Sequence, residues 1–181
     1  MNKIKKTLVY LVLLAALVAS LSFYACTPKV DVTIYFAKYS DNQAYLDPEI
    51  RKISKDANLY KSVIEELIKG PANKELYPTI PSDIKINSIT IKDNLATVDF
   101  SKEIITSELI PHSSTTEILA IYSIVNTLTN FEEIKQVKIT VEGKDKGQID
   151  GLYIEDFWGH VGIYETFGRN EEIIGKNMIQ Q

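Results

Sequence analysis

The chain has 181 residues, of which 45% are hydrophobic and 24% are charged, and its formal net charge at pH 7 is -4. This length and composition are those of one globular domain that can bury a core. Residues 1–25 contain three lysines and no acidic residue, so the remaining chain carries -7, which is -4 less three positive charges. An acidic surface argues against nucleic acid as a partner and against a polybasic contact with anionic lipid.

The N-terminus has the layout of a secretory signal. Lysines at positions 3, 5 and 6 precede an apolar stretch over residues 8–21. Cys26 follows this stretch and is the only cysteine of the chain, which excludes an intramolecular disulfide. We therefore expect residues 1–25 to be a signal peptide that directs the domain out of the cytoplasm.

A cysteine directly after Ala25 resembles the bacterial lipobox, although Phe23 and Tyr24 depart from its usual residues. The resemblance implies that the Cys26 thiol receives a diacylglycerol group and becomes the new N-terminus. The alternative is an uncleaved signal anchor with an incidental cysteine. With lipid on Cys26, residues 26–31 are a short linker, about 20 Å when extended, and the domain is expected at the extracytoplasmic face of the cell membrane.

Alternation of apolar and polar residues predicts a first strand over residues 32–36. A stretch with the composition of a turn follows it. Residues 45–46 and 50–53 are predicted as two short strand pieces, because Asp47 and Pro48 separate them.

Helical spacing of apolar residues predicts a first helix over residues 60–68, with Asn58 or Asp56 as its N-cap. Gly70 and Pro71 should end this helix, as a C′ glycine followed by proline does. A loop that contains further prolines then leads to the next strands.

Two alternating runs over residues 86–101 predict a β-hairpin around which the rest of the chain is organised. Asp93 and Asn94 are expected to form its two-residue loop. The cross-strand pairs on the apolar side are then Ile91 with Ala96 and Ile89 with Val98. The opposite side, which should face water, carries Thr90, Lys92, Thr97 and Asp99.

The residues from Ser114 to Glu117 match a capping box at the start of a second helix, which should end near residue 130. Apolar residues cover nearly two sides of this helix, so we expect it to be the central one. A last strand is predicted over residues 137–141. The tail from residue 145 contains glycines and interleaved aromatic residues, and we expect it to wrap the domain with Trp158 docked on an edge.

The predicted order of elements is β-α-β-β-α-β, which indicates an α+β fold of the split β-α-β kind. Because the strands share a polar and an apolar side, the two helices should lie on one face of a mixed sheet and leave the other face open, as a two-layer sandwich. The domain is expected over residues 32–174, with residues 175–181 as a C-terminal tail.

Several stretches resemble the GerMN domain, which occurs in sporulation and germination proteins and in other bacterial lipoproteins. They include LIKGP at residues 67–71, ITIKDNLATVDFS at residues 89–101 and TLT at residues 127–129. The closing stretch GHVGIYETFGRNEEII at residues 159–174 also resembles the tail of the family, with Gly162 in place of an expected acidic residue.

The resemblance implies a non-enzymatic module outside the cytoplasm, often lipid-anchored, with a fold similar to the ring-building motifs of secretion and sporulation channels. Some members of the family carry two tandem copies of the domain, whereas this chain has room for one. Other envelope or sporulation proteins are therefore the expected partners, and no cofactor is implied.

Two histidines are the residues that could act as general bases near neutral pH. His112 is expected to be a solvated residue in the loop before the second helix. His160 lies between glycines, where a buried structural role competes with ligand binding, and together with Trp158 it is the candidate ligand site. Asp99 and Glu103 are expected on a solvated strand face. No motif or spacing predicts a catalytic, metal or phosphate-binding site.

Two functions are open from the sequence. The first is a protein-interaction module, which requires an open sheet face or an unpaired edge strand. The second is a lipoprotein that binds cell-wall fragments or a small ligand, which requires a concave pocket beside His160 and Trp158. The open face of the predicted sandwich favours the first.

Overall fold

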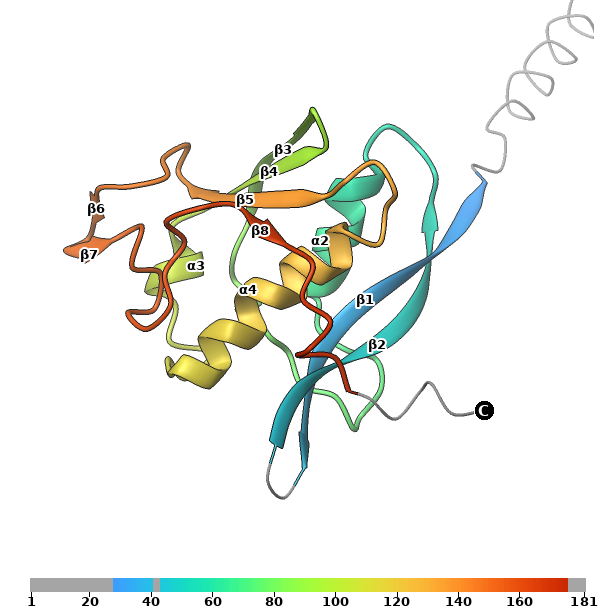
Figure 1. Ribbon diagram of the computed structural model, residues 1–181, viewed down its shortest axis with the longest axis horizontal. Coiled ribbons are helices and arrows are strands. Elements are labelled where there is room, and N and C mark those ends of the chain that lie inside the picture. Colours follow the sequence, from blue (N-terminus) through green and yellow to red (C-terminus); the bar gives the residue numbers. More distant parts are fainter. Residues whose placement is uncertain (1–27, 41–42, 176–181) are drawn as a thin grey trace, which may run out of the picture.

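A four-stranded mixed sheet with two helices on one face organises the computed structural model, which describes residues 28–40 and 43–175 (Figure 1). The order of the sheet is β3–β4–β5–β8, in which β4 and β5 are parallel and the other neighbours antiparallel. Its strands are β3 (Ile86–Lys92), β4 (Leu95–Phe100), β5 (Gln136–Val141) and β8 (Phe167–Gly168). The helices are α2 (Leu59–Ile68) and α4 (Ser114–Leu128). The α+β fold class with a mixed sheet is confirmed.

The β3–β4 hairpin has the predicted register, in which Ile91 lies opposite Ala96 and Ile89 lies opposite Val98. Asp93 and Asn94 both have positive φ, at 52° and 63°. These values are those of a type I′ turn, whose twist matches the right-handed twist of the strands. Local sequence therefore determines this hairpin.

The side of the hairpin away from the helices carries the predicted polar residues, and all of them except Asp99 are at least partly exposed. Thr90 and Lys92 are exposed. The expectation of a solvated Asp99 is wrong, since this residue is only 8% exposed. Its carboxylate accepts hydrogen bonds from the Thr140 hydroxyl at 2.8 Å and from the Gly143 N–H at 2.7 Å. The turn after β5 therefore covers Asp99.

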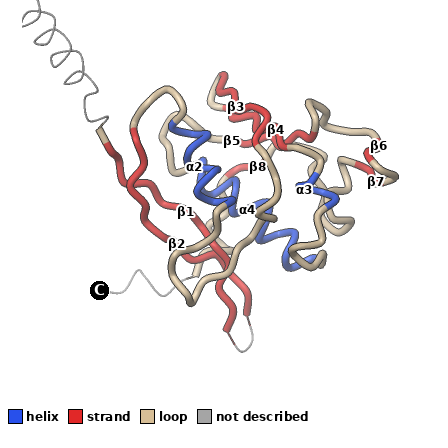
Figure 2. Tube along the Cα trace, turned by 180° about the vertical axis from the view of Figure 1, so that it is seen from behind, coloured by secondary structure: helices blue, strands red, loops and turns tan. Residues whose placement is uncertain are grey.

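The first two strands, β1 (Lys29–Ser40) and β2 (Gln43–Ser54), form a separate two-stranded ribbon that packs against the helices (Figure 2). Two predictions are wrong here, because the first strand does not enter the central sheet and the two short strand pieces belong to one continuous strand. Pro48 does not break this strand, because each strand of a two-stranded ribbon is an edge strand, where a proline can turn its nitrogen away from the partner.

The middle of β1 is buried on both of its sides, which explains why it leaves the central sheet. Ile34 and Phe36 are fully buried in the main core between the sheet and the helices. Tyr35 and Ala37 point the other way and pack into a second, smaller core with Leu46 of β2 and Leu119 of α4. The ribbon therefore covers a side of α4 that the central sheet does not reach.

Helix α2 ends as predicted, since Gly70 has a φ of 83° and its N–H donates to the Leu67 carbonyl oxygen at 3.1 Å, with Pro71 next. Asn58 occupies the N-cap position, but its side chain makes no capping hydrogen bond. Instead, the Asn58 N–H donates to Oδ1 of Asp56 at 2.8 Å. Both predicted capping residues thus contribute to the start of the helix.

The capping box of α4 lies one residue earlier than predicted. The Ser113 hydroxyl accepts the Thr116 N–H at 3.2 Å, and the Thr116 hydroxyl accepts the Ser113 N–H at 3.0 Å. Glu117 is therefore not part of the capping box, and its side chain is fully buried.

The segments after β4 and β5 are more structured than the sequence pattern indicates. A short helix, α3 (Glu103–Thr106), interrupts the loop after β4, and β6 (Gln148–Ile149) pairs with β7 (Leu152–Tyr153). The last described residues reach the ribbon, where the Leu46 N–H donates to the Ile173 carbonyl oxygen at 2.8 Å and the Gly175 N–H donates to the Leu46 carbonyl oxygen at 2.9 Å. The tail thus ties β2 to the rest of the domain.

Arg51 on β2 joins the ribbon to the C-terminal end of α2. Its guanidinium donates to the carbonyl oxygen of Glu66, in the last turn of α2, at 3.0 Å and to that of Gly70, just after the helix, at 2.6 Å. Carbonyl groups in the last turn have no partner within the helix, so Arg51 supplies one for Glu66. It also pairs with the carboxylates of Glu66 at 2.7 Å and Glu49 at 2.6 Å. Glu49 in turn accepts two backbone N–H groups of the loop after α2.

This cluster makes the stability of the domain depend on pH. Burial by itself would raise the pKa of the Glu49 and Glu66 carboxyls, but backbone N–H donors at Glu49, Lys69 at Glu66, and Arg51 at both hold each pKa below its ordinary value of 4.5. A carboxyl whose pKa is lowered by folding gives its full stabilisation at pH values above its pKa in the unfolded state. The stabilisation is lost as the pH falls through the lower, folded-state pKa.

Replacing Glu49 by glutamine is expected to lower the free energy of unfolding by about 1–2 kcal/mol at pH 7 and to have a smaller effect at pH 3. Urea unfolding followed by the fluorescence of Trp158, the only tryptophan, measures both values. The matched control is Glu75→Gln, because the Glu75 carboxylate is 74% exposed and contacts Lys38 only at 3.6 Å. An equal effect of Glu49→Gln at both pH values would contradict the charged role of this carboxyl.

Candidate interaction surface

The expected signal peptide over residues 1–25 and the first two residues of the expected linker, Cys26 and residue 27, lie outside the described residues. The rest of that linker, residues 28–31, is described, and residues 29–31 belong to β1. The described chain begins at Pro28 and enters β1 at Lys29. In residues 28–40 and 43–175, no helix is both long enough and apolar enough to cross a membrane.

Trp158 is packed into the domain. Its side chain is 6% exposed, and its indole N–H donates to the Ile104 carbonyl oxygen in α3 at 2.8 Å. The rings of His112 and Phe157 stack against the indole at centroid distances of 4.6 and 5.0 Å. His112 is exposed in its loop, as predicted. Trp158 therefore fastens the tail to α3.

His160 is exposed, so the expectation of a buried structural histidine is wrong. It borders a shallow hollow of about 200 Å³, lined by Asp156, Gly159, His160, Val161, Gly162 and Tyr164. The Tyr164 hydroxyl donates to the Asp156 carboxylate at the rim. The indole of Trp158 does not line the hollow, so the structure does not bring the two candidate ligand residues into one pocket.

Glu117 holds the loop that carries His160. Its buried carboxylate accepts the N–H groups of three consecutive residues, with Oε2 at 2.9 Å from His160 and Oε1 at 3.0 and 2.8 Å from Val161 and Gly162. Glu117 lies in the first turn of α4, where the helix dipole favours a negative charge. These contacts stabilise a carboxylate inside the protein and give it a structural role.

The sequence contained a signal for this buried carboxylate. Glu117 precedes Ile121 by four residues and Ile124 by seven, so it lies on the apolar side of the helix. A charged residue on a buried stripe is uncommon unless it is paired. Because Glu117 also matched the last position of a capping box, its place on the apolar side of the helix was not used in the prediction.

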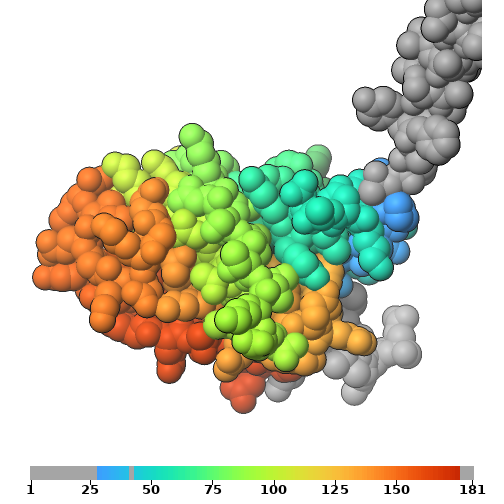
Figure 3. Space-filling view, turned by 90° about the horizontal axis from the view of Figure 1, so that it is seen from above, coloured from blue at the N-terminus to red at the C-terminus, as the bar shows by residue number. Residues whose placement is uncertain are grey.

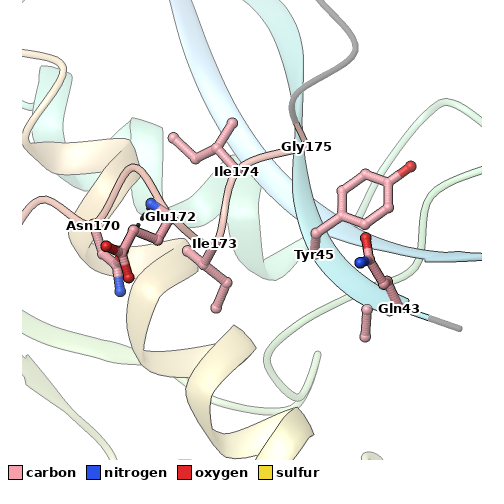
Figure 4. A pocket seen from close by; sticks show the side chains of 8 residues that line it. Gln43, Tyr45, Asn170, Glu172, Ile173, Ile174 and Gly175 are labelled. Atoms are coloured by element: carbon pink, nitrogen blue, oxygen red, sulfur yellow. Dashed lines mark hydrogen bonds between the residues drawn. The ribbon is translucent and has the colours of Figure 1, made fainter.

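A larger hollow of about 540 Å³ lies where the tail meets the start of β2 (Figure 4). Gln43 and Tyr45 line it from the strand, while Asn170, Glu172 and Ile173 line it from the tail. Glu172 is its single carboxylate, and no histidine, lysine or arginine is among its described lining residues. This hollow therefore offers no general acid–base pair.

Two carboxylates of β2 form ion pairs with basic side chains. Asp47 pairs with Lys38 at 3.1 Å, and Glu49 pairs with Arg51. Among the residues that the structure describes, no group of three or more His, Cys, Asp or Glu side chains could hold a metal ion.

Within the residues that the structure describes, the outer edge of β3 is an unpaired strand edge of the central sheet. β3 is the first strand of the sheet, and in the described parts of the chain only β4 pairs with it. Every second residue of such a strand points its N–H and C=O groups away from the sheet. A groove of about 450 Å³ lies between α2 and the start of β3. In Figure 3, the turquoise part of the chain, which includes α2, adjoins the green part, which includes β3. An unpaired edge of this kind can accept a strand from another chain.

Comparison with known proteins places these features in a family. A family model described as "Germane: Sporulation and spore germination" matches residues 33–147. The spore germination protein GerM of Bacillus subtilis (strain 168) is 28% identical over 121 residues, which are 64% of this chain and 32% of that protein. The chain thus spans about a third of the length of this curated relative.

Solved structures agree with this fold. The tandem GerMN domains of the sporulation protein GerM from Bacillus subtilis match with a TM-score of 0.62 at 24% identity, over 83% of this chain and 49% of that one. A protein from Clostridium perfringens that is described as a candidate lipoprotein matches with a TM-score of 0.50 at 29% identity, over 77% of this chain and 87% of that one. Because the family model covers more than half of the sequence, the chain belongs to the Germane family of sporulation and spore germination proteins.

Proposed function

We propose that this chain is a non-enzymatic protein-interaction module outside the cytoplasm, acting in an assembly that serves sporulation, spore germination or a related envelope process. The observation that carries the proposal is the outer edge of β3, which no other strand of the described residues covers. Its backbone groups can bind any extended segment, whatever the sequence of that segment. Membership of the Germane family supports the process.

The contacts of the residues that could have served in a catalytic site support a binding module rather than an enzyme. The carboxylates of Asp99 and Glu117 accept two and three hydrogen bonds, respectively, from within the domain. Trp158 is buried in packing, and within the described residues the contact of His160 with a titratable group is through its backbone N–H to Glu117, not through its imidazole. A catalytic acid–base pair would need two such groups that converge on a substrate.

The proposal also places a lipid on Cys26, which would hold the domain at the outer face of the cell membrane. The lipobox-like sequence around Cys26 supports this anchor, as does the likeness to the candidate lipoprotein of Clostridium perfringens. A lipidated Cys26 would leave a linker of a few residues before Lys29, so β1 would begin close to the bilayer.

Photo-crosslinking in the cells that make the protein tests this function. A photoreactive residue is placed at one of three exposed or half-exposed positions of the full chain, Thr90, Lys138 or Tyr77. We expect an adduct with another envelope protein in the membrane fraction, strongest from Thr90 on β3. In a Cys26→Ser variant, the protein should leave the membrane fraction and the adduct should be lost. The absence of a protein adduct from all three positions would contradict the proposal.

A further inference from the structure

The groove between α2 and the start of β3 is positively charged, although the chain as a whole is acidic. Its lining includes three lysines, Lys61, Lys69 and Lys85, and one acidic residue, Glu65. The formal charge of the full chain is -4. Lysines beside one edge strand on an acidic protein form a local field of opposite sign, which can orient a charged partner.

Two of these lysines are available to a partner. Within the described residues, Lys61 and Lys85 form no ion pair, and both are exposed. Lys69 is also exposed but already contacts the Glu66 carboxylate, which Arg51 shares. The net attraction for a carboxylate therefore comes chiefly from Lys61 and Lys85.

The bottom of the groove is apolar and continues into the main core. Ile84 and Ile86 are 5% and 8% exposed, and Ile68 at the end of α2 is half-buried. An added strand would lie about 4.8 Å from β3 in the plane of the sheet. Its inward-facing side chains would then contact the outer surface of α2, because α2 packs beneath β3.

We propose that this groove and the β3 edge together bind an extended, acidic segment of another protein as a fifth strand of the sheet. Apolar residues of that segment face Ile68 and α2, and the carboxylates that alternate with them lie beside Lys61 and Lys85. This inference rests on the proposed function and adds to it the site and the chemistry of the partner. A second copy of this chain is a poorer occupant, because two copies of an acidic protein repel each other.

The test is photo-crosslinking from Thr90 in the full chain, with the linked partner peptide identified by mass spectrometry. Charge reversal in Lys61→Glu/Lys85→Glu is expected to reduce the adduct about tenfold, because attraction becomes repulsion at the contact. The matched control Lys144→Glu/Lys146→Glu makes the same change in net charge at exposed lysines after β5. This control, and Lys61→Arg/Lys85→Arg, should keep the adduct.

A carbodiimide that joins lysine amines directly to carboxylates provides the second measurement. It should link Lys61 or Lys85 to an aspartate or glutamate within the same partner segment that Thr90 captures. The inference is overturned if the captured segment is neutral or basic, if the adduct resists charge reversal at Lys61 and Lys85, or if adducts form only from Lys138 or Tyr77. Those three outcomes leave the proposed function intact, whereas the absence of protein adducts from all positions removes both.

Discussion

Replacing Glu117 by alanine is expected to lower the free energy of unfolding by about 3–5 kcal/mol. The side chain is fully buried, and three backbone N–H groups of the loop at residues 160–162 donate to its carboxylate. Alanine would leave these donors without a partner and a cavity beneath the loop. Urea unfolding followed by the fluorescence of Trp158, two residues before the loop, measures the loss.

The variant Glu117→Gln separates charge from shape. Glutamine keeps the volume and one acceptor oxygen, but it turns an amide NH₂ toward backbone donors, so a loss of about 1–3 kcal/mol is expected. The matched control is Glu132→Ala, because Glu132 is an exposed glutamate just after α4, and it should change stability by less than about 0.5 kcal/mol. If Glu117→Ala were as mild as this control, the loop would not depend on the carboxylate.

Replacing Gly162 by aspartate, the kind of residue that the family resemblance leads one to expect here, should cost about 2–4 kcal/mol. Gly162 has a φ of 79°, and a Cβ atom at this position would lie 2.6 Å from the Glu155 carbonyl oxygen and 2.2 Å from the Tyr164 ring. The new carboxylate would also lie near that of Glu117, whose Oε1 accepts the Gly162 N–H. The loop would have to leave its position on α4.

Gly159→Asp is the control for this substitution. Gly159 also has a positive φ, of 89°, but a Cβ atom there would meet no heavy atom within 4 Å. The backbone strain alone should therefore cost about 1–2 kcal/mol, less than Gly162→Asp. Thermal unfolding of both variants, monitored by circular dichroism, gives the comparison. Equal losses would show that crowding by Glu155 and Tyr164 does not restrict position 162.

The substitutions at Glu117 and Gly162 bear on the choice between a protein-interaction module and a ligand-binding lipoprotein. The loop held by Glu117 carries His160, the candidate ligand residue, and closes over a hollow of about 200 Å³. The Trp158 indole is absent from its lining, so Trp158 and His160 do not together form a binding site there. The outer edge of β3 lies elsewhere on the sheet, so variants at Glu117 that still fold should retain the adduct from Thr90.

Much of the local structure could be predicted from the sequence. The register of the hairpin follows from alternation and from two residues, Asp93 and Asn94, that tolerate positive φ. The end of α2 follows from Gly70 and Pro71. The helices lie on one face of the sheet because every core strand of the sheet has a single apolar side. These features depend on residues within a few positions of one another.

Other features escaped prediction because they have little local pattern. β8 contains two residues and pairs with β5 over a separation of some thirty residues. The burial of Asp99 depends on Gly143, 44 residues later. Pro48 led to the prediction of a break between two short strands, yet it lies within the continuous strand β2. An unpaired edge strand was expected for an interaction module, but the sequence did not indicate which strand it would be. The lysines beside β3 could not be predicted either, because they come from separate parts of the chain.

The amino-acid sequence by itself determined the elements, their approximate order and the apolar side of each, since these follow from spacing and turn chemistry. Only the tertiary structure decided that β1 pairs with β2 outside the central sheet, because a strand with alternating apolar and polar residues fits either place. The choice depends on which side of α4 remains uncovered. The tertiary structure also decided the role of Glu117, whose partner Gly162 lies 45 residues away. A buried carboxylate is stable only when distant backbone donors converge on it, and spacing along the chain does not specify that convergence.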